Sequence, residues 1–241
     1  MNKLLTTIGL LFLSLQGFST CIAIYIAPNG HIYVAADSKR TFLLDSNKTI
    51  TESVCKIHNV GDTWFAVSGF DDSALTHEAN NALKHGGEQY LEMEAFGGAM
   101  ASHYQRLMDE AQQYYPEKLK EFLANGLADV AFFGYINDQP KVVEVQFSVN
   151  MKKNKPLVSF RIDNIAYQVV IGISKDIDNA PPDELPSKFE MLNKPEKYVV
   201  DLVKIEARKQ PLVVGEPIDL LELKPGAALW LRRNEYTTAI Q

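Results

Sequence analysis

The stretch that decides the fold reads Thr20-Cys21-Ile22-Ala23-Ile24-Tyr25-Ile26, then Ala27-Pro28-Asn29-Gly30, then His31-Ile32-Tyr33-Val34-Ala35-Ala36-Asp37-Ser38-Lys39. Two apolar runs rich in β-branched residues flank Pro28-Asn29-Gly30, which is a strong signal for a tight turn. The sequence therefore predicts a β-hairpin with strands over residues 21–26 and 32–36.

The segment before this hairpin has the composition of a secretory signal peptide. Lys3 is followed by an almost unbroken apolar run and then by small residues that end at Ser19. Such a segment is too short for a membrane span and is typical of a cleaved export signal. We therefore predict that residues 1–19 are removed and that the mature protein is secreted or periplasmic. Cleavage after Ser19 would make Thr20 the first residue, with Cys21 as the alternative.

Residues 20–241 are predicted to form a single α+β domain. The pattern of apolar residues alternates in some segments and follows a helical period in others, without a regular strand-helix-strand repeat. This order favours antiparallel sheets with helices packed outside them. Strands are expected at 57–60, 64–67, 129–136, 142–147, 157–162, 167–173, 218–223 and 228–231; helices at about 75–83, at 96–111 and from Pro195; and a loop or broken helix at 174–193.

Composition excludes several classes of function. The formal net charge is −6 and there is no basic run, so the chain lacks the electrostatic signature of a nucleic-acid-binding protein. No segment after the leader is long and apolar enough to span a bilayer. The five histidines and two cysteines show no metal-ligand spacing, so no metal site is expected.

A threonine at the start of a mature chain has unusual chemistry. Its hydroxyl and a base that could activate it, the free α-amine, belong to the same residue. The pKa of such an amine is ordinarily near 8 and falls when an ammonium group lies nearby, which leaves a neutral base at working pH. Lys56, just before the strand expected at 57–60, is the candidate for that ammonium. Asp37, at the end of the second strand, is the candidate to hold Lys56 charged and oriented.

These residues resemble a known family. The combination of Thr20-Cys21-Ile22, Val34-Ala35-Ala36-Asp37-Ser38-Lys39, Lys56-Ile57 and Ala66-Val67-Ser68-Gly69 is similar to the proteasome β-subunit branch of the N-terminal-nucleophile (Ntn) hydrolases, most of all to bacterial proteins that begin Thr-Cys-Ile. The resemblance is specific over residues 20–72 and weaker beyond. It implies a four-layer αββα sandwich whose catalytic threonine is freed by cleavage of the preceding peptide bond.

The resemblance also implies roles for single residues. Thr20 would be the nucleophile and, through its amine, the general base, with Asp37 and Lys56 as partners of that amine. Gly69 would supply the backbone N–H of an oxyanion hole. The implied substrate is a small peptide or another amide, hydrolysed through an acyl-enzyme without a cofactor. Because related β subunits form rings, a homo-oligomer is one expected assembly, beside a dimer and a monomer.

Two departures from the family pattern leave alternatives open. The spacing from threonine to Asp37 is one residue longer than usual, which also allows Cys21 to align as the first residue and nucleophile. The late serine and aspartate that support the terminal amine in the family have no match, since Pro211-Leu212-Val213-Val214 occupies their place. The chain is therefore expected to be a hydrolase or, alternatively, a non-catalytic scaffold or binding protein that keeps the fold.

The two cysteines offer a test of the nucleophile. If Thr20 and Lys56 face the cleft, side-chain alternation sends Cys21 and Cys55 to the opposite face of the sheet. On adjacent strands they would be close enough for a disulfide in an oxidising compartment. We therefore predict a Cys21–Cys55 disulfide if Thr20 is the nucleophile and a free Cys21 if it is not, with two unrelated buried thiols as the equal alternative.

Overall fold

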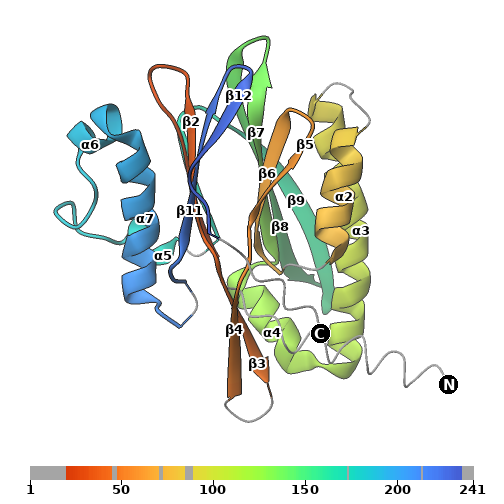
Figure 1. The fold of residues 1–241 in the computed structure, drawn as a ribbon. Helices are drawn as coiled ribbons and strands as arrows, with labels where there is room; N and C mark the ends of the chain where they lie inside the picture. The colour runs from red at the N-terminus through yellow and green to blue at the C-terminus, as the bar shows by residue number, and fades with distance from the viewer. Residues whose placement is uncertain are drawn as a thin grey trace.

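The fold is a four-layer αββα sandwich, as the family resemblance implies. Two antiparallel five-stranded sheets face each other, and helices cover the outer side of each sheet (Figure 1). The computed structural model describes residues 20–44, 48–70, 73–84, 89–172, 174–212 and 214–234. The predicted signal peptide lies outside the described residues.

The first sheet contains the predicted N-terminal hairpin. Ile26 lies opposite Ile32 in the antiparallel pair, so the strands close around the expected turn. The sheet has the order β10-β1-β2-β11-β12. Its strands are β1 (Cys21–Ile26), β2 (Ile32–Asp37), β10 (Gln168–Gly172), β11 (Ile218–Lys224) and β12 (Ala227–Arg232).

The second sheet runs in sequence order from β5 to β9. Its strands are β5 (Ile57–Val60), β6 (Thr63–Gly69), β7 (Ala128–Ile136), β8 (Gln139–Lys152) and β9 (Lys155–Ile165). A separate two-stranded hairpin, which the sequence did not predict, joins the two sheets and projects from one end of the sandwich (Figure 1). It consists of β3 (Lys39–Leu44) and β4 (Lys48–Ser53).

The helices divide between the two outer faces (Figure 1). Helices α2 (Ser73–Lys84), α3 (Gln89–Tyr114) and α4 (Pro116–Asn125) lie on the second sheet, and α7 (Pro195–Lys209) lies on the first. As predicted, α3 ends before Pro116 and α7 begins at Pro195, where proline fits the first helical turn. Helix α4 was not predicted. The expected broken helix contains α5 (Lys175–Asp178) and α6 (Lys188–Asn193).

Side-chain alternation in β1 explains how one strand serves two core layers. Ile22 and Ile24 belong to the apolar cluster between the sheets, whereas Cys21, Ala23 and Tyr25 belong to the cluster under α7. All five side chains are buried. A third cluster fills the space between the second sheet and helices α2 to α4. Because both faces of β1 are apolar, its alternating side chains pack into two core layers, one on each side of the sheet.

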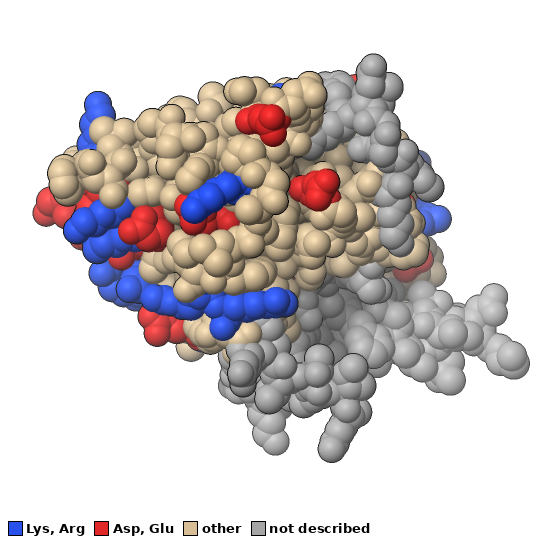
Figure 2. All heavy atoms as spheres, turned by 45° about the horizontal axis from the view of Figure 1, so that its top comes forward, with Lys and Arg blue, Asp and Glu red and all other residues tan. Residues whose placement is uncertain are grey.

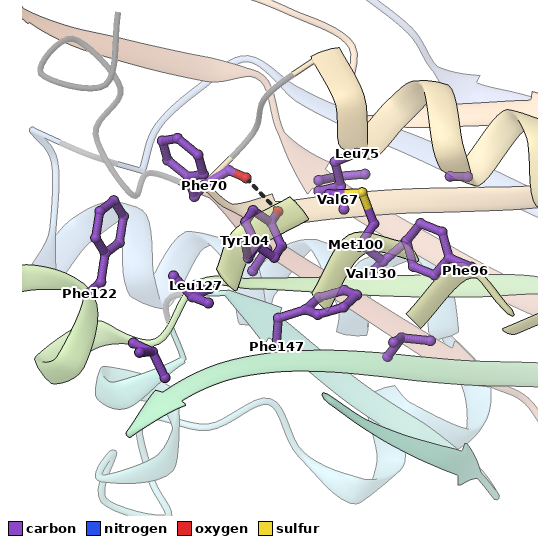
Figure 3. Packing of buried hydrophobic residues seen from close by; sticks show 14 of the residues in the cluster. Val67, Phe70, Leu75, Phe96, Met100, Tyr104, Phe122, Leu127, Val130 and Phe147 are labelled. Carbon is purple, nitrogen blue, oxygen red and sulfur yellow. Dashed lines mark hydrogen bonds between the residues drawn. The ribbon is translucent and has the colours of Figure 1, made fainter. Parts of the chain in front are cut away.

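The third cluster holds the end of β6 in place (Figure 3). The hydroxyl of Tyr104, on α3, donates a hydrogen bond of 3.1 Å to the carbonyl of Phe70. The Phe70 backbone N–H donates to the carbonyl of Leu127 at 2.6 Å, and its ring packs edge-on against Phe122 of α4. Two helices thus fix the backbone immediately after Gly69.

Basic and acidic side chains lie next to one another on the face shown in Figure 2, with a broad uncharged area between the groups. This matches the modest net charge of the chain. Among the described helices, none combines the length and the apolar character that crossing a membrane requires.

Candidate active site

Thr20 lies at the edge of a cleft of about 520 Å³ between the two sheets. It immediately precedes β1, and its side chain is largely buried. Ser68 and Gly69 from β6, Asp129 from β7 and Gly172 from β10 line the same cleft. The cleft therefore forms where strand ends from both sheets meet, and residue 20 is one of its walls.

Lys56 and Asp37 form a buried ion pair, as the sequence predicts. Lys56 Nζ lies 3.0 Å from Asp37 Oδ1, and the two side chains are 7% and 0% exposed. Lys56 Nζ also donates to the Lys39 carbonyl at 2.7 Å. Because a buried charge is costly unless it is paired and hydrogen-bonded, these contacts hold the Lys56 ammonium in one position.

Asp37 also fixes the start of β1. The backbone N–H of Cys21, the residue after Thr20, donates to Asp37 Oδ1 at 2.8 Å. Burial raises the pKa of Asp37, while the Lys56 ammonium and the Cys21 N–H act in the opposite direction. The Gly215 backbone N–H also lowers the pKa of Asp37. The pair thus couples the Lys56 ammonium to the backbone beside Thr20.

Gly69, at the end of β6, lines the same cleft as Thr20. Its φ of +97° is one that residues with a side chain rarely adopt. A Cβ at this position would lie 2.6 Å from the Leu127 carbonyl oxygen and 2.7 Å from Ala128 Cα. Only glycine therefore allows the backbone of β6 to turn at the cleft wall in this way.

Gly172 and Ser68 are cleft residues that the sequence analysis missed. Ser68 Oγ donates to the Thr20 carbonyl at 3.5 Å. A Cβ on Gly172, whose φ is +87°, would clash with Ser68 Oγ and lie 2.3 Å from the Thr20 carbonyl oxygen. The available signal was a glycine at the end of an apolar strand, which marks a close approach of another backbone.

Cys21, the alternative nucleophile, faces away from the cleft. Its side chain is fully buried in the cluster under α7. Burial, followed by the negative charges of Asp37 and Glu206, raises the pKa of the Cys21 thiol well above its ordinary value. A thiol in such surroundings stays protonated and is a poor nucleophile.

The Cys21–Cys55 disulfide prediction is wrong, because both cysteines are free. It assumed that the two residues lie on adjacent strands, whereas β1 belongs to the first sheet and β5 to the second. Cys21 packs under α7, while Cys55 packs against the cluster between the sheets and donates to the Ile57 carbonyl at 3.1 Å. A free Cys21 therefore says nothing about whether Thr20 is the nucleophile.

Two carboxyl groups between the sheets have strongly shifted pKa values. Burial raises the pKa of Asp129 to about 6, and the Gly172 N–H and then Arg161 oppose that shift. Burial also raises the pKa of Glu144, on the next strand, to about 7, while a hydrogen bond from Gln146 opposes the shift. The polar end of this interface therefore holds two carboxyl groups that titrate near neutrality.

These shifts predict a pH dependence of stability. A carboxyl group whose pKa is higher in the folded state binds protons more tightly there, so the free energy of unfolding falls as pH rises through the interval between the two values. For Glu144 that interval runs from 4.5 to about 7. We expect Glu144→Gln to reduce the loss of stability between about pH 5 and about pH 8 by about 2 kcal/mol, measured by urea unfolding.

Glu94→Gln is the matched control, because Glu94 is exposed on α3. It should leave the pH dependence unchanged. An equal pH dependence in wild type and Glu144→Gln would show that Glu144 is not its source.

The segment that replaces the family's late serine and aspartate offers no equivalent side chain at its described positions. Val214 is fully buried and apolar, and the Pro211 carbonyl accepts a hydrogen bond from Lys39 Nζ. Within the described residues, no three histidine, cysteine, aspartate or glutamate side chains are grouped so that they could hold a metal ion.

Comparison with known proteins supports the fold alone. No protein-family model matches the chain, and no curated protein matches its sequence. A solved structure of Anbu, a (Gly-1) mutant from Hyphomicrobium sp. strain MC1, is similar with a TM-score of 0.50 and 14% sequence identity. The similarity covers 92% of this chain and 88% of Anbu. The protein therefore shares its fold with Anbu.

Proposed function

We propose that this protein is an Ntn amidohydrolase whose nucleophile is Thr20, and that it cleaves a peptide or another amide bond. The observation that carries the proposal is the buried pair of Lys56 and Asp37, bonded through Asp37 Oδ1 to the backbone N–H that follows Thr20. An ion pair excluded from water needs a reason, since apolar residues of similar size often stabilise a fold as well or better. Catalysis at Thr20 explains why this buried pair is present.

The chemistry begins once the peptide bond before Thr20 is cut. The Thr20 hydroxyl attacks the amide carbonyl, and the α-amine of the same residue accepts the hydroxyl proton. The Lys56 ammonium lowers the pKa of this amine and keeps it neutral near pH 7. The Gly69 N–H stabilises the oxyanion, and the amine then donates its proton to the leaving nitrogen. Water activated by the same amine releases the acid from the acyl-enzyme.

Burial supports Thr20 over Cys21 in this role. Thr20 lines the cleft, whereas the Cys21 thiol lies on the other side of the sheet under α7. Making Cys21 the first residue would also convert its N–H, which now donates to Asp37, into a terminal amine. The choice of Thr20 over Cys21 as the nucleophile rests on this placement.

The proposal predicts the first residue of the mature protein. N-terminal sequencing or intact-mass analysis should show a chain that starts at Thr20, because only then is the amine free to act as a base. This start would also agree with export through a signal peptide over residues 1–19. A mature chain that starts at Cys21 would transfer the role to cysteine, and one that keeps upstream residues would contradict the hydrolase.

A non-catalytic scaffold is the alternative function. It is favoured by Val214 and Pro211, which stand where relatives place polar groups that support the terminal amine. A scaffold would keep the fold, and assembly into a homo-oligomer would be its main property. Light scattering of the purified protein measures that assembly, and the absence of amide hydrolysis by a correctly processed chain would favour the scaffold.

A further inference from the structure

Resting on the proposed function, the geometry points to a substrate class: amides that carry a positively charged group beside the bond to be cut, selected by the Asp129 carboxylate. Asp129 was not among the residues that the sequence or the family resemblance marks. It is the second residue of β7 and lies directly opposite Ser68 of β6, and both residues line the cleft with Thr20.

Asp129 is held at the junction of the two sheets. Its Oδ2 accepts a hydrogen bond of 3.4 Å from the backbone N–H of Gly172, which is paired with Cys21 in the first sheet. Ser68 Oγ in turn reaches the Thr20 carbonyl. A group bound at Thr20 and Gly69 would therefore have Asp129 on its flank.

No described residue neutralises Asp129 by an ion pair. The positive charge of Arg161 of β9 lowers the pKa of Asp129, but the Arg161 guanidinium is bonded to Asp163 at 2.6 Å and to Gln146 at 2.8 Å. Glu144 of β8 and Asp163 of β9, which lie opposite each other on the same face of the second sheet, are also acidic. A long, weak hydrogen bond from Gly172 leaves most of the hydrogen-bonding capacity of the carboxylate unused.

The rim of the cleft carries the remaining charges. Lys175 and Asp178 of α5 line it and are exposed, and Asp178 accepts a hydrogen bond from Ser174. Charges in contact with water are screened, whereas a partly buried carboxylate between two sheets is screened much less. Asp129 is therefore the least screened charge that a substrate group inside the cleft would meet, and a lysine-like ammonium or a guanidinium is the chemistry that satisfies it.

Two tripeptide arylamides that differ only in the residue before the cut bond test this selection. One ends in lysine and the other in norleucine, which has nearly the same shape without the ammonium. We expect wild type to prefer the lysine substrate in kcat/KM by about 10- to 100-fold. Asp129→Asn keeps the size and a hydrogen-bond acceptor but loses the charge, so the preference for the lysine over the norleucine substrate should disappear.

Asp178→Asn is the matched control, because it removes an exposed acid from the same cleft. It should keep most of the preference. Equal cleavage of both arylamides by wild type, or an unchanged preference in Asp129→Asn, would overturn the selection by Asp129 and leave the hydrolase proposal standing.

A binding measurement separates this inference from the proposed function. Calorimetry of Thr20→Ala with the lysine and norleucine tripeptide amides reports selection without turnover. If wild type cleaves neither substrate but the lysine peptide still binds more tightly, and does so only with Asp129 present, the hydrolase proposal fails and the cation site stands. If neither peptide is preferred in binding, the cation site is refuted.

The pH dependence gives a second readout. The Asp129 carboxyl group, with its pKa near 6, binds a cation only when ionised, so the preference for lysine should fall about tenfold per pH unit below about pH 6. Arg161 lowers the pKa of Asp129, and the Asp129 charge raises the pKa of Glu144, so the titrations of the two carboxyl groups are coupled. The pH profile of the lysine preference is therefore recorded for Glu144→Gln beside that of wild type. A preference that stays constant down to about pH 4 would contradict the role of Asp129.

Discussion

Thr20→Ala should abolish amide hydrolysis without unfolding the protein. Removing a nucleophile lowers kcat by about 10⁴-fold or more, because only the binding and oxyanion contributions remain. The fold should be kept, since Thr20 precedes β1 and the contact that Ser68 makes with it is to its backbone carbonyl. The loss is measured as the kcat for an arylamide substrate, with thermal unfolding recorded on the same samples.

Two companion variants make this result specific. Thr20→Ser keeps a hydroxyl and an α-amine on one residue and should retain measurable activity. Cys21→Ala removes a buried thiol and should cost stability but not the chemistry. Activity that survives in Thr20→Ala and disappears in Cys21→Ala would identify cysteine as the nucleophile, provided that mass analysis shows the same processing in every variant.

Lys56→Met should cause the largest loss of stability together with a loss of activity. The substitution leaves Asp37, which is fully buried, without its counter-charge. Breaking a buried ion pair by removing one partner costs about 3–5 kcal/mol in the free energy of unfolding. Activity falls because the terminal amine loses the ammonium that lowers its pKa, so any residual rate should shift to higher pH. Urea unfolding and a pH–rate profile measure the two effects.

The double variant Lys56→Met with Asp37→Asn separates stability from catalysis. It removes both charges, so much of the stability should return, while activity stays low because the ammonium is still missing. Lys118→Met is a surface control, because the Lys118–Glu121 pair has a similar separation of 2.8 Å but its side chains are 31% and 51% exposed. It should change stability by less than about 1 kcal/mol. Full activity in the double variant would remove Lys56 from the mechanism.

Local patterns predicted the elements that have strong local signals. The hairpin of β1 and β2 follows from two apolar runs around Pro28-Asn29-Gly30, and α7 begins at the expected proline. The hairpin of β3 and β4 was not predicted, because Lys48-Thr49-Ile50-Thr51-Glu52-Ser53 is mostly polar and lacks a clear apolar face. Helix α4 was missed because the proline that ends α3 also begins a new helix one residue later.

Predictions about the site also succeeded where the signal was local and failed where it depended on distant parts of the chain. Asp37 and Lys56 were predicted from their positions at strand ends, and the structure brings them within 3.0 Å. The disulfide between Cys21 and Cys55 failed because alternation fixes which face a side chain takes but not which strands are neighbours. Asp129 was missed because an aspartate near the start of a strand is common. Nothing in the local sequence shows that this end of β7 lines the same cleft as Thr20.

The sequence by itself determined the hairpin, the α+β class and the residues at the strand ends, because turn chemistry and apolar periodicity act over a few residues. Only the tertiary structure decided that β1 and β5 belong to different sheets, that Lys56 reaches Asp37 at the end of β2, and that Asp129 faces the cleft. These pairings join residues far apart in the chain, and they depend on how two apolar sheet faces pack against each other, a property that no single segment carries.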